Sequence, residues 1–91
     1  MKVYRFIVKG KVQGVFYRKS IQQMASLGHI QGYVKNLPDG SVEVVAALHE
    51  DQLEDFLQML KNGSPASRVD EIEMEELEED DLLYDGFEIR Y

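Results

Sequence analysis

Apolar and polar residues alternate in several parts of the chain, and this spacing is typical of strands. Residues 3–8 alternate between two faces, one carrying Tyr4, Phe6 and Val8 and the other carrying Arg5 between two aliphatic residues. We expect the first of these faces to be buried. The same reasoning predicts four further strands, at residues 30–36, 41–48, 69–75 and 87–91.

Two segments repeat their apolar residues at the spacing of a helix. In residues 50–61 they recur at positions i, i+3, i+4 and i+7: Leu53, Phe56, Leu57 and Leu60. Acidic residues in the first turn of this helix and Lys61 in its last turn suit the helix dipole. A shorter helix is predicted from Arg18 to about residue 27, closing near residues 28–29.

Glycine, proline and acidic residues mark the connections. Residues 9–16 contain Gly10 and Gly14 and are predicted to form a loop. Residues 37–40, Leu-Pro-Asp-Gly, have the composition of a hairpin turn. Residues 76–86 form an acidic connection. The order of elements is therefore β-α-β-β-α-β with a short extra strand at the end.

This order predicts a fold of the α+β class. We expect a ferredoxin-like βαββαβ sandwich, with two helices on one face of a mainly antiparallel sheet. The chain has 91 residues, which is enough for one domain and too few for two. We therefore expect a single domain over residues 1–91.

Composition and charge exclude several classes of function. The chain has no cysteine, so disulfides, thiolate chemistry and cysteine-based metal sites are ruled out. Its net charge of -7 opposes binding to nucleic acid and to anionic membrane surfaces. No apolar run approaches the roughly 20 residues that a membrane span requires, and no secretion signal is visible. We expect a cytoplasmic, monomeric protein that binds neither membrane nor nucleic acid.

The charges are unevenly distributed along this acidic chain. Residues 2–19 contain no acidic residue and six basic ones: Lys2, Arg5, Lys9, Lys11, Arg18 and Lys19. Such a segment favours a local site for an anion. A chance run of solvated basic residues is the alternative, and charge alone does not separate the two.

The loop at residues 10–18 could hold a phosphate group. It leads into a predicted helix, whose first amides lack partners within the helix and whose dipole favours an anion. Gly10 and Gly14 allow the backbone conformations with which successive amides converge on an anion. Arg18 adds a planar, permanently charged donor. Many glycine-containing loops before helices bind nothing, and the nucleotide-binding glycine motifs are absent here.

Residues 10–18 read Gly-Lys-Val-Gln-Gly-Val-Phe-Tyr-Arg, which resembles the acylphosphatase signature G-x-V-Q-G-V-x-[FY]-R. The resemblance covers nearly the whole chain in the same order. It continues at Ala25 and through residues 32–36, 39–43, 63–69 and 87–91. The combination of this loop with a downstream Gly-Tyr-Val-Lys-Asn is highly specific to that family.

The resemblance implies a substrate, a reaction and a set of site residues. The substrate is an acyl phosphate, a small molecule, and the products are a carboxylate and inorganic phosphate. In this family Asn36 corresponds to the residue that orients the attacking water. The phosphoryl group is bound by Arg18 together with the amides of the loop: Gln13, Gly14, Val15, Phe16 and Tyr17. The family uses no metal and no organic cofactor.

Two positions depart from the family pattern. His29 stands where most relatives have glycine at the end of the first helix, so it must adopt a left-handed conformation unless Gly28 takes that role. Leu37 follows Asn36 where a polar residue is frequent, and the loss of a hydrogen bond there would loosen Asn36.

Other interpretations of the same residues stay open. A non-catalytic regulatory module that binds a small anion would need the same cradle. The family signature also occurs in a domain of larger hydrogenase-maturation proteins, although the short chain favours a stand-alone protein. His29 and His49 are expected at the surface. Phe16, Tyr17 and Tyr33 either border the acyl group of a substrate or pack structurally.

Overall fold

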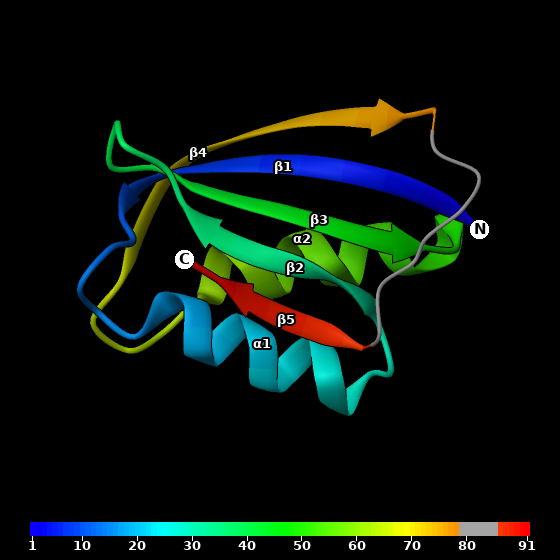
Figure 1. Cartoon of the computed structure of the whole chain (residues 1–91), viewed down its shortest axis with the longest axis horizontal. Coiled ribbons are helices and arrows are strands. Elements are labelled where there is room, and N and C mark those ends of the chain that lie inside the picture. Colours follow the sequence, from blue (N-terminus) through cyan, green and yellow to red (C-terminus); the bar gives the residue numbers. More distant parts are fainter. Residues whose placement is uncertain (79–85) are drawn as a thin grey trace.

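The computed structural model describes residues 1–78 and 86–91, and in it two helices cover one face of a five-stranded sheet (Figure 1). The strands are β1 (Lys2–Lys11), β2 (Gln31–Asn36), β3 (Val42–Leu48), β4 (Arg68–Leu77) and β5 (Phe87–Arg90). The helices are α1 (Tyr17–Leu27) and α2 (Leu53–Asn62), with a short 3₁₀ turn, η1 (Glu50–Gln52), before α2. The predicted α+β arrangement is confirmed.

The strands lie in the order β4-β1-β3-β2-β5. β1 pairs antiparallel with β3 and β4, and β2 pairs antiparallel with β3. Only β5 runs parallel to its neighbour β2, with Arg90 opposite Lys35. Because Asn36 follows Lys35, this register brings the end of β2 close to the last residues of the chain.

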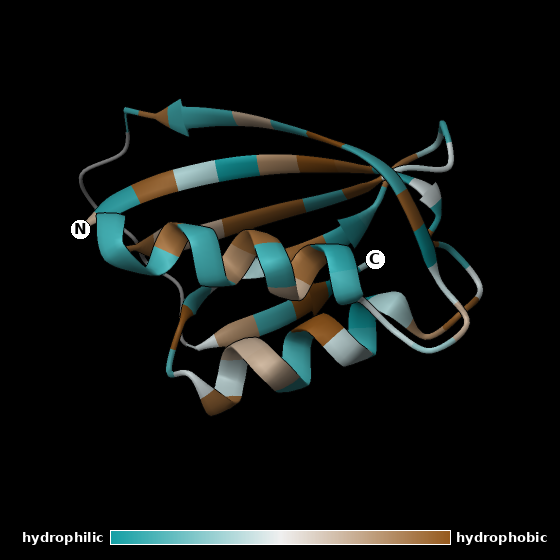
Figure 2. Cartoon of the chain, turned by 180° about the vertical axis from the view of Figure 1, so that it is seen from behind, coloured by the Kyte–Doolittle hydropathy of each residue, from teal (hydrophilic) through white to brown (hydrophobic). Residues whose placement is uncertain are grey.

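The core lies between the sheet and the two helices. Hydrophobic residues, brown in Figure 2, recur along the strands and along both helices. The predicted face of β1 is confirmed, since Tyr4, Phe6 and Val8 are buried. α1 adds Ile21 and α2 adds Leu60, both fully buried. Burying one such side chain contributes about 1.5–3 kcal/mol, so this core fixes the positions of both helices on the sheet.

Two strands are longer than predicted. β1 continues through a bulge between Lys9 and Gly10 and ends at Lys11, because β4 keeps pairing with it as far as Arg68. At Gly10 a side chain would collide with the main chain of Arg68, and its φ of 135° is one that few other residues adopt. β4 takes in residues 76 and 77 of the predicted acidic connection, of which residues 79–85 lie outside the described residues.

The helix ends also differ in detail from the prediction. The predicted helix at residues 50–61 begins as the 3₁₀ turn η1. His49 caps the start of this turn, and its amide donates to Gln52 Oε1 over 2.8 Å. At the end of α1, His29 adopts the left-handed conformation with φ of 56°, while Gly28 keeps a φ of -85°. Among the described residues, no helix is long and apolar enough to cross a membrane.

Candidate active site

The loop between β1 and α1 has an unusual backbone. Gly14 has a φ of 73°, and Phe16, at the N-terminal cap of α1, has a φ of 61°. A left-handed conformation costs a residue other than glycine roughly 1–2 kcal/mol. The Phe16 side chain is also 79% exposed, so burial does not repay this cost. No side chain caps α1 and its first turn has no acidic residue, so its first amides remain open to an anion.

Hydrogen bonds fix this loop to the segment between α2 and β4. The Ser64 hydroxyl donates to the carbonyl of Val15 over 2.7 Å, and the Ser20 hydroxyl donates to the carbonyl of Gly63 over 2.9 Å. The hydroxyl of Tyr17 donates to the carbonyl of Leu60 over 2.7 Å. Burial raises the pKa of Tyr17, which keeps this phenol protonated as a donor.

Gln13 ties the loop to the turn between β2 and β3. Its Nε2 donates to the carbonyl of Leu37 over 2.9 Å and to the carbonyl of Ser41 over 2.8 Å. Within the turn, Asp39 Oδ1 accepts from both the amide and the hydroxyl of Ser41, and these bonds lower the pKa of Asp39. The loop and the end of β2 are therefore held together.

Arg18, the second residue of α1, reaches toward the end of the chain. Its Nη1 donates to the carbonyl of Arg90 over 3.0 Å, and its guanidinium carbon lies 4.8 Å from the centre of the Tyr91 ring. The ion pairs found in residues 1–78 and 86–91 do not include Arg18. A guanidinium has five N–H donors, so most of them remain available to a ligand.

Asn36, the last residue of β2, carries an unpaired oxygen. Its Oδ1 is buried, and none of the residues in the described part of the chain donates a hydrogen bond to it. Buried polar atoms in proteins nearly always have a partner, so an unpaired one singles out Asn36 among the residues of β2. Leu37, which follows it, has an apolar side chain and offers it no donor.

Arg18 and Asn36 line the same cavity, which has a volume of about 320 Å³. Its other lining residues are Val12, Gly14, Phe16, Tyr17, Lys19, Ile89 and Tyr91. The structure therefore brings together most of the predicted site residues. Gln13 and Val15 do not line the cavity, because Gln13 bonds to the turn after β2 and Val15 is buried. Only their main-chain amides could serve a ligand.

The three aromatic residues considered as neighbours of the acyl group, Phe16, Tyr17 and Tyr33, lie in different environments. Tyr17 packs inside the protein, and its side chain is almost fully buried. Tyr33 lies on the open face of the sheet, the one that no helix covers, and donates to Glu43. Only Phe16 projects at the cavity as an exposed side chain. The remaining apolar lining comes from Ile89 and Tyr91, which the sequence reasoning did not assign to the site.

The chain is similar to known proteins of one family. The family model described as acylphosphatase matches residues 4–89. The chain belongs to the acylphosphatase family. A curated acylphosphatase from Caldivirga maquilingensis is 46% identical over 90 residues, which cover 96% of this chain and 92% of that protein.

Solved acylphosphatases have the same fold. The crystal structure of the acylphosphatase from Bacillus subtilis superposes with a TM-score of 0.91 at 41% identity and covers both chains completely. The structure of an acylphosphatase from Coxiella burnetii gives a TM-score of 0.86 at 35% identity, covering 98% of this chain and 92% of that one. The acylphosphatase fold is therefore shown for this chain.

Proposed function

We propose that this member of the acylphosphatase family hydrolyses acyl phosphates, with Arg18 and the loop amides of residues 13–17 holding the phosphoryl group and Asn36 orienting the water. The main support for this proposal is that Arg18 of α1 and Asn36 of β2 line one cavity at an uncapped helix N-terminus. The small-molecule partners are an acyl phosphate and the phosphate released from it.

The cradle supplies positive charge without a metal ion. Transfer of a phosphoryl group passes through a loose transition state whose charge lies on the equatorial oxygens. Fixed amides at the start of α1 and the Arg18 guanidinium suit those oxygens, because both donate hydrogen bonds in a planar or convergent arrangement. Arg18 has no carboxylate to neutralise it among the described residues, so its charge is available to the substrate.

Asn36 is suited to hold the attacking water. A water in the cavity would hydrogen-bond to the side-chain amide of Asn36, which lines the cavity, and turn a lone pair toward phosphorus. As the water oxygen bonds to phosphorus, the bond from phosphorus to the acyl oxygen breaks and its electron pair leaves with the carboxylate. The water proton passes to a phosphoryl oxygen, because an amide is too weak a base to accept it.

The leaving group explains why the site is so sparse. A carboxylate is a weak base, so it departs without protonation and no general acid is needed. Phe16, Ile89 and Tyr91 offer apolar surface to the acyl part of the substrate. An acyl phosphate thus suits a cavity lined by both polar and apolar side chains.

Phosphate release from benzoyl phosphate in the presence of EDTA tests the activity. We expect catalytic turnover that the chelator does not change. The alternative, a regulatory module, predicts saturable binding of inorganic phosphate by calorimetry but no release from benzoyl phosphate, and that result would overturn the proposal.

We also propose that the protein acts as a monomer in the cytoplasm. Sedimentation equilibrium tests the first point, since a mass of about 10.5 kDa is expected for one chain. Fractionation of the source cells tests the second.

A further inference from the structure

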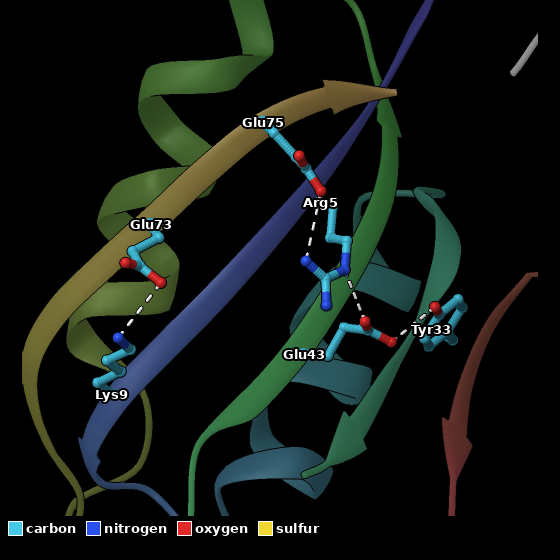
Figure 3. A network of polar contacts seen from close by, with 6 residues as sticks. All are labelled: Arg5, Lys9, Tyr33, Glu43, Glu73 and Glu75. Atoms are coloured by element: carbon cyan, nitrogen blue, oxygen red, sulfur yellow. Dashed lines mark hydrogen bonds and ion pairs between the residues drawn. The ribbon is translucent and has the colours of Figure 1, made fainter. Parts of the chain in front are cut away.

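Side chains from all five strands form one connected row on the open face of the sheet. They follow the order of the strands, from β4 through β1, β3 and β2 to β5. Figure 3 shows four of them as sticks. The five members of this row, which we call the cross-sheet row, are Glu75, Arg5, Glu43, Tyr33 and Arg90.

Each link of the row is a short, specific contact. Arg5 donates from Nη1 to Glu75 Oε1 over 3.3 Å and from Nε to Glu43 Oε2 over 2.7 Å. The Tyr33 hydroxyl donates to the other carboxylate oxygen of Glu43, Oε1, over 2.7 Å. The Arg90 guanidinium carbon lies 4.0 Å above the Tyr33 ring, within the range of a cation–π contact.

Glu43 is the fixed centre of the row. Its side chain is only 13% exposed, and both of its oxygens have a partner. Burial alone would raise the pKa of Glu43, but the bonds from Tyr33 and Arg5 outweigh it and lower this pKa. The carboxylate therefore stays charged and holds the Tyr33 hydroxyl in one place, which sets the plane of the ring beneath Arg90.

The row ends at the residue that holds Arg18. The main-chain carbonyl of Arg90 accepts the hydrogen bond from Arg18 Nη1, and the ring of the next residue, Tyr91, lies beside the same guanidinium. β5 has four residues and, in the described part of the chain, pairs with one strand, β2. The contact with Tyr33 thus restrains the end of a short edge strand at the point where it meets the site.

We infer that Tyr33 is a positioning residue for Arg18. The Tyr33 ring holds the Arg90 side chain, so the Arg90 carbonyl stays where it can orient the guanidinium of Arg18 toward the cavity. This inference rests on the proposed function, in which Arg18 binds the phosphoryl group. It assigns a role to an aromatic residue that lies on the opposite side of the sheet from the helices.

Kinetics of three variants with benzoyl phosphate test the inference. Tyr33→Leu removes the ring and should lower kcat/KM by about fivefold, the size expected for loss of a cation–π contact. Tyr33→Phe keeps the ring beneath Arg90 but loses the bond to Glu43, so its loss of kcat/KM should be smaller than that of Tyr33→Leu. Glu73→Gln breaks the Lys9–Glu73 pair on the same face, which does not reach β5, and should have no effect (Figure 3).

A double-mutant cycle separates positioning from general loss of structure. In an Arg18→Gln background, Tyr33→Leu should change the residual kcat/KM by less than about twofold, because the residue being positioned is gone. Arg90→Gln, which keeps the carbonyl but removes the cation above the ring, gives a second test if Tyr33→Leu does not fold. It should reproduce the loss of about fivefold.

The outcomes distinguish this inference from the proposed function. If Arg18→Gln abolishes turnover but Tyr33→Leu and Arg90→Gln behave like Glu73→Gln, the inference is overturned and the proposed function stands. If Tyr33→Leu has the same effect with and without Arg18, the inference is also overturned. Full activity of Arg18→Gln would instead contradict the proposed function itself.

Discussion

The cavity beside α1 and the open face of the sheet differ in how far their charged and polar side chains are paired. On the open face, Arg5 and Lys9 each contact two carboxylates, and both oxygens of Glu43 are occupied. Around the cavity, Arg18 has no carboxylate partner among the described residues and Asn36 Oδ1 is buried without a partner. The two regions belong to one sheet and its flanking helix.

The difference shows that hydrogen-bonding groups available to a ligand lie around the cavity. Exposed pairs on the open face, such as Lys9–Glu73, contribute little to stability, since surface pairs are worth about 0–1 kcal/mol each. The left-handed conformation of Phe16 costs the protein stability. Such a cost is typical of functional sites.

The largest expected effect comes from Arg18→Gln. Removing the guanidinium should lower kcat for benzoyl phosphate by about 10³-fold or more, because it neutralises charge that develops on the phosphoryl oxygens. Steady-state kinetics measure the change. Arg68→Gln, which removes an exposed arginine paired with Asp70, is the matched control and should leave kcat unchanged. Equal losses of kcat in the two variants would contradict the role of Arg18 in binding the phosphoryl group.

Asn36→Ala should cost nearly as much. Loss of the amide that orients the water should lower kcat by about 10²–10³-fold, by analogy with the removal of one oxyanion donor. KM should change little, since the phosphoryl group is bound by other residues. Asn62→Ala, at the exposed end of α2, is the control. A change in KM alone would mean that Asn36 binds the substrate and does not orient the water.

Phe16→Gly tests the strained side of the cavity. Glycine adopts a positive φ without penalty, so we expect the melting temperature to stay the same or rise. Loss of the exposed ring should raise the KM for benzoyl phosphate by about tenfold. The KM for acetyl phosphate should rise less, because its acyl group is smaller. Parallel assays of the two substrates measure this. An equal change for both would show that Phe16 does not meet the acyl group.

The smallest expected effect concerns the open face. Since the pKa of Glu43 is lower in the folded protein than in the unfolded chain, its charge stabilises the fold at neutral pH and this contribution is lost as pH falls through the folded pKa. Between about pH 6 and about pH 3, the free energy of unfolding should fall more steeply for the unmodified protein than for Glu43→Gln. Urea denaturation at several pH values compares the slopes, and parallel curves would refute the prediction.

Much of this fold could be predicted from local patterns. The alternation in β1 indicated its buried face because one side of that strand packs on helices. The extension of β4 could not be predicted, since its exposed acidic residues show no apolar period and its length comes from pairing with β1. The parallel pairing of β5 with β2 is likewise a contact between distant segments, which local patterns do not contain.

The site, too, contains residues that could be predicted from the sequence and residues that could not. Arg18 was predicted from the chemistry of the loop and Asn36 only from the family resemblance, and the structure places both on one cavity. The role of the Arg90 carbonyl and the Tyr91 ring depends on where β5 lies, so no local pattern indicated it. The left-handed Phe16 went unpredicted because an aromatic residue rarely adopts that conformation.

A crystal structure with inorganic phosphate, at a concentration that saturates binding in solution, tests the central claim most directly. We expect the anion in the cavity, within hydrogen-bond distance of the Arg18 guanidinium and of main-chain amides in residues 13–17. An empty cavity under those conditions, or phosphate bound elsewhere with no contact to Arg18, would contradict the account.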